Sequence, residues 1–255
     1  MSMKKAHAEV DFSIESGLMK KEYGDFGDSR HLFEDDAKKD GIVFLDEGVH
    51  HFNLDNGASL TVYASPFTPS ADADWGFQYK LGEHHDFAIN SKVDAVITHG
   101  PPRGVLDLTA SKQRGGCEHL FTAVARARPR LLCFGHIHEG WGAKLVVWRD
   151  TPSESPSHFA DTNNGESAVV DTLASLRPGK WDTPEDIAEK EARLRALRTA
   201  GYRATDHSSG SEHPIVPGRT TLFANAAIQS ADEGQAQLPW VIDIDLPAAI
   251  HSNGV

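Results

Sequence analysis

The alternation of apolar and polar residues predicts short strands along the first part of the chain. Residues 5–12 alternate strictly, the period-two pattern of a strand with one buried face, and would place His7, Glu9 and Asp11 in a row on its other face. Residues 13–40 are charged and interrupted by glycine, which predicts a solvated loop with a short helix. Further β-type runs lie at 41–48, 49–54 and 59–67. Asn56-Gly57 separates the last two runs and predicts a hairpin turn, because this pair readily takes positive φ angles.

Two longer apolar runs each lead to histidine beside glycine. Residues 93–102 and 129–140 have few polar interruptions, which is typical of strands buried on both faces. The segment between them has helical spacing, and Pro129 is a stop signal for that helix. A strand-helix-strand unit is therefore predicted. Additional strands are predicted at 144–148, 219–228 and 238–247.

The segment at about 150–218 has a different composition, rich at first in Ser, Pro, Asn and Asp, and predicts a surface loop. Within it, Thr183 and Asp186 have the spacing of a capping box, Pro184 stands at a first helical position and Gly201 at an end. These signals predict a helix. Its apolar stripe is narrow, so that it can pack on a sheet or remain solvated. We expect a single domain over residues 1–255 with a loop-plus-helix insertion at about 150–218.

Composition narrows the classes of partner. Asp and Glu total 37 against 25 Lys and Arg, a net charge of -12, so that the average surface repels nucleic acid. No apolar run approaches the roughly 20 residues of a membrane span, and the first residues lack the apolar core of a secretory signal. Cys117 and Cys133 lack metal-type spacing, which favours free thiols in a reducing compartment. We expect a cytoplasmic protein that binds neither nucleic acid nor membranes.

Three histidines at two predicted strand ends are the candidate chemistry. His99 stands in Thr-His-Gly-Pro-Pro, and His136 and His138 stand in Gly-His-Ile-His. Ring nitrogens removed from water need partners, so these histidines are either metal or active-site groups or ordinary hydrogen-bonded residues. Neutral imidazoles are good ligands for Zn, Mn or Fe. Two other groups combine histidine with an acid, and we expect both on the solvated surface. They are His84-His85-Asp86 and Asp206-His207.

The two histidine segments carry a family resemblance. ITHGPPRG (97–104) and FGHIHEGWG (134–142) resemble the last two signature blocks of the calcineurin-like metallophosphoesterases, and SPFTPSADADWGFQY and TTLFANAA resemble segments of their MPPED-type branch. The resemblance implies an α/β sandwich of two facing mixed β-sheets flanked by helices. It also implies two metal ions that hold a phosphate ester and activate a water molecule.

By this resemblance, His99 and His136 would bind one metal and His138 the other, while Asn225 lies near the site without an assigned role. The family's Asp-x-His and Gly-Asp blocks have no counterpart in this sequence, so we expect an N-terminally truncated version of the fold. Its third block aligns with residues 8–11, where Glu9 replaces an asparagine ligand and Val10 replaces the histidine acid. A rebuilt site with one divalent metal on His99, His136 and Glu9 is an alternative to a site without metal.

Three functions remain open from the sequence. The first is a phosphoesterase of reduced metal content that acts on a phosphodiester or small phosphomonoester. The second is a repurposed, non-hydrolytic enzyme of small-molecule or secondary metabolism, an isomerase, cyclase or lyase, which need not bind a metal. It would use His99, His136 or His138 as acid-base or hydrogen-bonding groups. The third is a non-catalytic binding protein. Because the absent strands would leave a sheet edge unpaired, we expect a homodimer through the N-terminal region.

Overall fold

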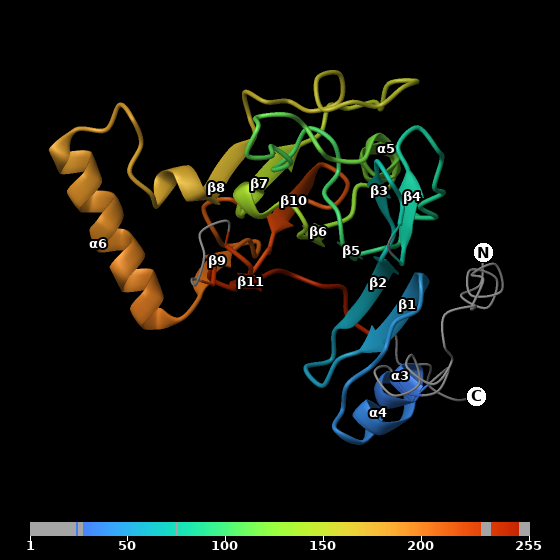
Figure 1. The fold of residues 1–255 in the computed structure, drawn as a ribbon. Coiled ribbons are helices and arrows are strands. Elements are labelled where there is room, and N and C mark those ends of the chain that lie inside the picture. Colours follow the sequence, from blue (N-terminus) through green and yellow to red (C-terminus); the bar gives the residue numbers. More distant parts are fainter. Residues whose placement is uncertain (1–23, 25–27, 75, 231–235, 250–255) are drawn as a thin grey trace. The chain divides into compact units, whose positions relative to one another are not determined.

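The computed structural model describes residues 24, 28–74, 76–230 and 236–249 (Figure 1). The chain divides into two compact units, Met1–Asp46 and Glu47–Val255. The strand predicted at residues 5–12, and with it Glu9, lies outside the described residues. The predicted N-terminal dimer surface lies partly outside them as well.

Short helices make up the described part of the first unit. α3 (Asp28–His31), a π-helical turn η1 (Leu32–Asp36) and α4 (Ala37–Lys39) follow one another directly, as predicted for a short helix in this region. The prediction of a strand at 41–48 is wrong: the chain has no regular element from residue 42 to 47, and β1 begins at Gly48. The apolar run there finds no ladder partner among the described residues, and a strand requires one.

A seven-stranded mixed sheet forms the centre of the second unit. Its order is β1-β2-β5-β6-β10-β7-β8, with a parallel core of four strands and antiparallel pairs at both sides. The strands are β1 (Gly48–Asn53), β2 (Ser59–Ser65), β5 (Ala95–Thr98), β6 (Leu131–Phe134), β7 (Gly142–Val147), β8 (Ala168–Thr172) and β10 (Thr220–Asn225). β1 and β2 pair across the predicted Asn56-Gly57 turn, which confirms the hairpin. The expected α/β class with a mixed sheet is confirmed.

One helix covers one face of this sheet. α5 (Glu118–Ala127) begins at Cys117, whose Sγ accepts the Leu120 backbone N–H, and ends at Arg128 in left-handed conformation, one residue before the predicted stop. Its buried face packs on side chains from the four parallel strands and β7, which form the main apolar core. The core residues include Tyr63, Val96, Leu120, Phe121, Val124, Leu132, Phe134, Val146, Trp148 and Phe223.

A small second sheet covers part of the opposite face. β9 (Arg203–Asp206) and β11 (Trp240–Asp243) pair in parallel. Trp240 and Ile242 pack on the alternate residues of β7 and β10, which are Ala143, Leu145, Leu222 and Ala224. The unit thus has the layers of a sandwich, with the second sheet reduced to two strands among the described residues. A further short pair, β3 (Thr68–Ser70) and β4 (Gln78–Lys80), lies in the loops after β2.

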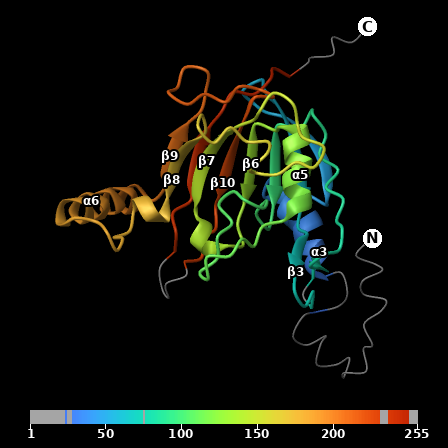
Figure 2. The same cartoon turned by 90° about the horizontal axis from the view of Figure 1, so that it is seen from above.

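The segment at 150–218 contributes more than a loop and a helix. It contains β8, which joins the edge of the large sheet, and β9, neither of which was predicted. The predicted helix is confirmed as α6 (Pro184–Ala200), with the capping box of Thr183 and Asp186 and with Gly201 left-handed at its end. α6 has no buried residue and extends away from the sheet in both views (Figures 1 and 2).

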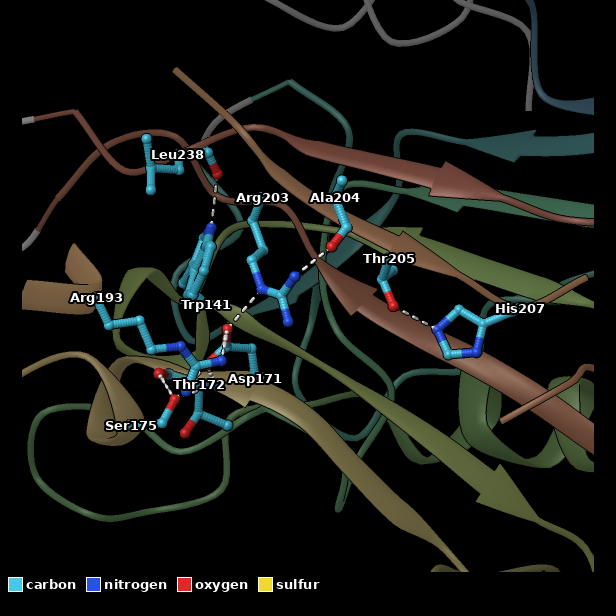
Figure 3. A network of polar contacts seen from close by, with 10 residues as sticks. All are labelled: Trp141, Asp171, Thr172, Ser175, Arg193, Arg203, Ala204, Thr205, His207 and Leu238. Carbon is cyan, nitrogen blue, oxygen red and sulfur yellow. Dashed lines mark hydrogen bonds and ion pairs between the residues drawn. The ribbon is translucent and has the colours of Figure 1, made fainter. Parts of the chain in front are cut away.

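A buried carboxylate joins α6 to both sheets (Figure 3). Asp171 of β8, whose side chain is fully buried, accepts hydrogen bonds from Arg193 of α6 and Arg203 of β9, each at 2.7 Å. The Arg203 guanidinium also lies over the ring of Trp240, which stacks on Trp141 at 4.9 Å between centroids. Because the two guanidinium groups share one desolvated carboxylate, this contact fixes the middle of α6 to the sheets.

Two observations bear on the sequence expectations for thiols and membranes. Cys117 and Cys133 are free thiols, the first buried and the second half-buried, as expected, and burial raises the pKa of Cys133. None of the helices in the described part of the chain is long and apolar enough to cross a lipid bilayer.

Candidate functional site

The parallel strands end in one row, and the candidate histidines follow directly after it. Pairing aligns Ser65 of β2 with Thr98 of β5, and Phe134 of β6 with Asn225 of β10. His99 leaves β5 one residue after Thr98, and His136 leaves β6 two residues after Phe134. The carboxyl ends of parallel strands are where α/β folds place their ligands. The candidate site therefore occupies the expected edge of the sheet.

The structure brings His99 and His136 into direct contact. His99 Nε2 lies 3.0 Å from His136 Nδ1, and the ring centroids are 4.8 Å apart. The loops that carry them are tied together, since the Gly135 N–H donates to the His99 carbonyl at 3.0 Å. At this separation the two nitrogens share one proton or one cation, because two facing lone pairs would repel each other.

His136 has an unusual backbone. Its φ is +66°, the left-handed region that favours glycine. A conformation of this kind costs about 1–3 kcal/mol and is found most often at functional sites. The turn it makes reverses the chain after β6 and presents the ring to His99. The sequence Gly-His-Ile-His gave no sign that histidine rather than glycine would take this conformation.

Partial desolvation favours the neutral form of both rings, although each residue remains exposed on one side. The pKa of His99 is lowered by desolvation and by the nearby His138, and the pKa of His136 is lowered by desolvation and then by the two other histidines. A neutral imidazole has a lone pair to give, so these two rings are suited to bind a cation or to accept a proton.

His138 is close but is not joined to the pair. It begins a short 3₁₀ helix, η2 (His138–Gly140), and its carbonyl accepts from the Gln237 side chain at 2.9 Å. Its charge acts on the pKa of both other rings. Among the described residues, however, no group of three or more His, Cys, Asp or Glu side chains has the arrangement of a metal site. The structure thus brings together two of the four predicted site residues, while Glu9 lies outside the description.

Asn225 acquires a role that the sequence did not show. Its side chain is fully buried, and its Nδ2 donates to the carbonyls of Ile137 at 2.9 Å and Leu106 at 3.2 Å. Its Oδ1 accepts the Ala227 N–H at 3.1 Å. Gly140 packs so closely here that an added Cβ would lie 2.1 Å from the Leu106 carbonyl. Asn225 therefore fixes both site loops to the end of β10.

A second buried carboxylate organises the loop after His99. Asp107 is fully buried, accepts the N–H groups of Gly104 at 2.9 Å and Gly116 at 3.2 Å, and forms an ion pair with Arg114. Its partners lie up to nine residues away in an irregular loop, so that no local pattern in the sequence marked it. Asp107 fixes the loop that follows His99. None of its hydrogen bonds among the described residues involves the histidine pair.

Two histidines that were expected on the surface are in fact packed. His207 is buried; its Nδ1 donates to the His213 carbonyl at 2.6 Å and its Nε2 lies 3.0 Å from the Thr205 hydroxyl. Burial lowers its pKa. His85 is only partly exposed, stacks on Phe67 with 4.4 Å between centroids, and contacts the Glu47 carboxylate at 2.6 Å. Both expectations were wrong because polar neighbours in sequence do not show what packs on a ring.

Comparison with known proteins gives relatives for part of the chain. No family model matches the chain. A segment of 86 residues, 32% of the chain, is 45% identical to human metallophosphoesterase domain-containing protein 1 and covers 26% of that protein. A UPF0046 protein of Caenorhabditis elegans is 39% identical over 87 residues, 32% of the chain and 22% of the relative. Over this segment the chain is similar to proteins of the MPPED branch of the calcineurin-like metallophosphoesterases.

The similarity covers about a third of the chain, and it spans only about a quarter of the length of these relatives. A probable rhamnogalacturonate lyase C of Emericella nidulans is also similar, 34% identical over 110 residues, 42% of the chain and 10% of that protein. These similarities support the resemblance stated from the two histidine blocks and agree with the mixed sheet of the structure. The roles of the individual site residues stay predictions.

Proposed function

We propose that this chain is a metal-assisted phosphoesterase that hydrolyses a phosphodiester or a small phosphomonoester with one divalent transition metal, Mn, Zn or Fe. His99 and His136 are two of its ligands, and Glu9 is the third. The single observation that carries the proposal is the 3.0 Å contact between His99 Nε2 and His136 Nδ1 at the carboxyl edge of the sheet.

This distance fits a shared metal. Two nitrogens that each lie about 2.0–2.1 Å from one ion are about 2.8–3.4 Å apart in octahedral or tetrahedral geometry. The lowered pKa of both rings keeps them unprotonated, as ligands must be. The donor set also fits, because imidazole nitrogen suits Zn, Fe and Mn better than Ca or Mg. The residues present are therefore compatible with one transition metal.

The residues of the chain have separate tasks in this proposal. A bound metal would supply a polarised phosphoryl oxygen and a water of lowered pKa. His99 and His136 hold the cation side of the site, and Asn225 holds the two loops in register through the Leu106 and Ile137 carbonyls. His138 lies beside the pair, where its ring can donate a hydrogen bond to a substrate oxygen.

The decisive experiment measures metal and turnover together. The protein is expressed with added Mn and Zn, and metal content is determined by elemental analysis in wild type, His99→Ala, His136→Ala and the exposed control His84→Ala. We expect near-stoichiometric metal in wild type and control and a loss of most of it in the two site variants. Hydrolysis of bis(4-nitrophenyl) phosphate should fall by about 10²-fold or more in the site variants. Wild type that is pure, folded and free of metal would falsify the proposal.

The runner-up is a non-hydrolytic acid-base enzyme, an isomerase, cyclase or lyase, in the same pocket. The observation that favours it is that two neutral rings in hydrogen-bond contact offer one N–H donor and one lone pair, which is an acid-base couple without a metal. The same experiment separates the two, since this function predicts a folded, metal-free wild type.

The setting that we propose is a small-molecule substrate and a cytoplasmic location. The net charge of -12 and the two free thiols support this setting. In this proposal neither nucleic acid nor a membrane is a partner of the protein.

A further inference from the structure

α6 is an exposed helix without a packing partner over most of its surface. It has 17 residues and none of them is buried. A helix of this length is only marginally stable by itself in water, and most helices in proteins are stabilised by packing of one face. α6 is held near its middle by Asp171 through Arg193, and Thr183 caps its N-terminus. Its outward face remains open to solvent (Figures 1 and 2).

The orientation of that face follows from exposure. The half-buried positions recur at Ile187, Lys190, Leu194 and Leu197, one side of the helix. At 100° per residue the opposite side is centred on Ala192, which is exposed. Ala188 and Ala196, one turn away in each direction, are exposed on the same side. The midline of the outward face is therefore made of small side chains.

The charges of α6 are divided between its two halves. Before Ala192 the acidic residues are Glu185, Asp186, Glu189 and Glu191, with one lysine, Lys190. After it every charged residue is basic, namely Arg193, Arg195 and Arg198. A helix with this distribution is complementary to a second copy of itself that runs in the opposite direction. The helix dipole also favours acidic residues near the N-terminus of a helix and basic residues near its C-terminus. It does not explain why the charge changes sign at Ala192, the centre of the open face.

We propose that α6 is a dimerisation helix that pairs with α6 of a second copy of this chain in antiparallel orientation about a two-fold axis beside Ala192. A rise of 1.5 Å per residue then sets Glu191 of one copy within about 3 Å, along the axis, of Arg195 of the other, on the same flank. Arg193 takes no part in this pairing, because its guanidinium is bound to Asp171 of its own copy. The alanine midline lets the helices approach at the short end of the usual spacing of about 8–10 Å.

The two-fold symmetry makes the contact self-limiting. Each copy presents the same patch, so the pairing closes as a dimer and does not continue as a filament. A single pair of helices buries less surface than the roughly 1,200 Å² of a typical stable interface, so the dimer is weak and depends on concentration. Its cross-helix contacts are ionic and exposed, and salt therefore weakens it.

The test is a charge exchange measured by sedimentation equilibrium from low to high micromolar concentration. Glu191→Arg and Arg195→Glu each place like charges together across the two-fold axis and should raise the dimer Kd by about tenfold. The double variant E191R/R195E restores opposite charges across the axis and the Glu191–Arg195 ion pair within the helix, which spans 3.6 Å in the wild type. It should return the Kd to near the wild-type value.

Two controls keep the result specific. Asp55→Arg makes the same charge change on the exposed β1–β2 turn and should leave the Kd unchanged. Helix content by circular dichroism, measured at the lowest concentration, shows whether a single variant loses α6 itself. A wild type that is monomeric throughout overturns the proposal. A dimer whose Kd is unchanged in both single variants also overturns it. An interface in the N-terminal region would behave in this way.

Discussion

His136 shows how one residue can be placed for chemistry at the expense of stability. Its ring reaches His99 only because its backbone has a φ of +66°, where a side chain with Cβ costs about 1–2 kcal/mol and glycine almost nothing. We therefore expect His136→Gly to be more stable than His136→Ala by about 1 kcal/mol in urea unfolding, although both lose the ring.

His138, two residues on, is the matched control for that comparison. It is not among the residues with positive φ, so His138→Gly should be less stable than His138→Ala, the usual order for the two residues. If glycine and alanine were equivalent at both positions, the backbone strain at His136 would be refuted.

At the scale of elements, the sequence predicted what is local. α6 has its capping box, its proline and its terminal glycine within 19 residues, and the histidine blocks end strands that are apolar throughout. β8 and β9 were missed because their stability comes from distant partners, β7 and β11, and their own runs of five and four residues are too short to show a pattern. The histidine pair could likewise be proposed from its motifs, whereas the left-handed turn at His136 could not.

Asn225 is the clearest case of a non-local role, and it leads to a prediction. Its amide joins carbonyls that lie 119 and 88 residues away in sequence. Asn225→Ala leaves these buried groups without a donor and should destabilise the protein by about 2–3 kcal/mol. Asn225→Asp should cost more, because a carboxylate would face two carbonyl oxygens.

Urea unfolding, followed by tryptophan fluorescence, measures both variants of Asn225. The exposed Asn53 on β1 offers a control, since Asn53→Ala should stay within about 0.5 kcal/mol of wild type. A wild-type midpoint for Asn225→Ala would mean that the site loops are fixed by other contacts.

At the scale of the whole molecule, four histidines that lose part or all of their hydration on folding couple folding to pH. Burial lowers the pKa of His99, His136, His158 and His207 in the folded state, below the value of about 6.5 for an exposed ring. On acidification these histidines therefore become protonated in the unfolded chain at a higher pH than in the folded chain. Stability is complete above about pH 6.5 and is lost as the pH falls below that value.

His207 allows this coupling to be tested apart from the candidate site. It is 2% exposed, and it bonds the end of β9 to the His213 carbonyl. Each unit by which its pKa is lowered corresponds to about 1.4 kcal/mol of stability lost at low pH.

His207→Gln can keep a donor toward His213 but cannot titrate. It should be less stable than wild type at pH 7.5, and its free energy of unfolding should fall less steeply between pH 6.5 and 5. His51→Gln, at an exposed position of β1, should keep the wild-type slope. Parallel slopes for wild type and His207→Gln would assign the acid sensitivity to the site histidines. A metal bound at His99 and His136 would make the pH dependence of stability steeper, because protons and metal compete for the same lone pairs.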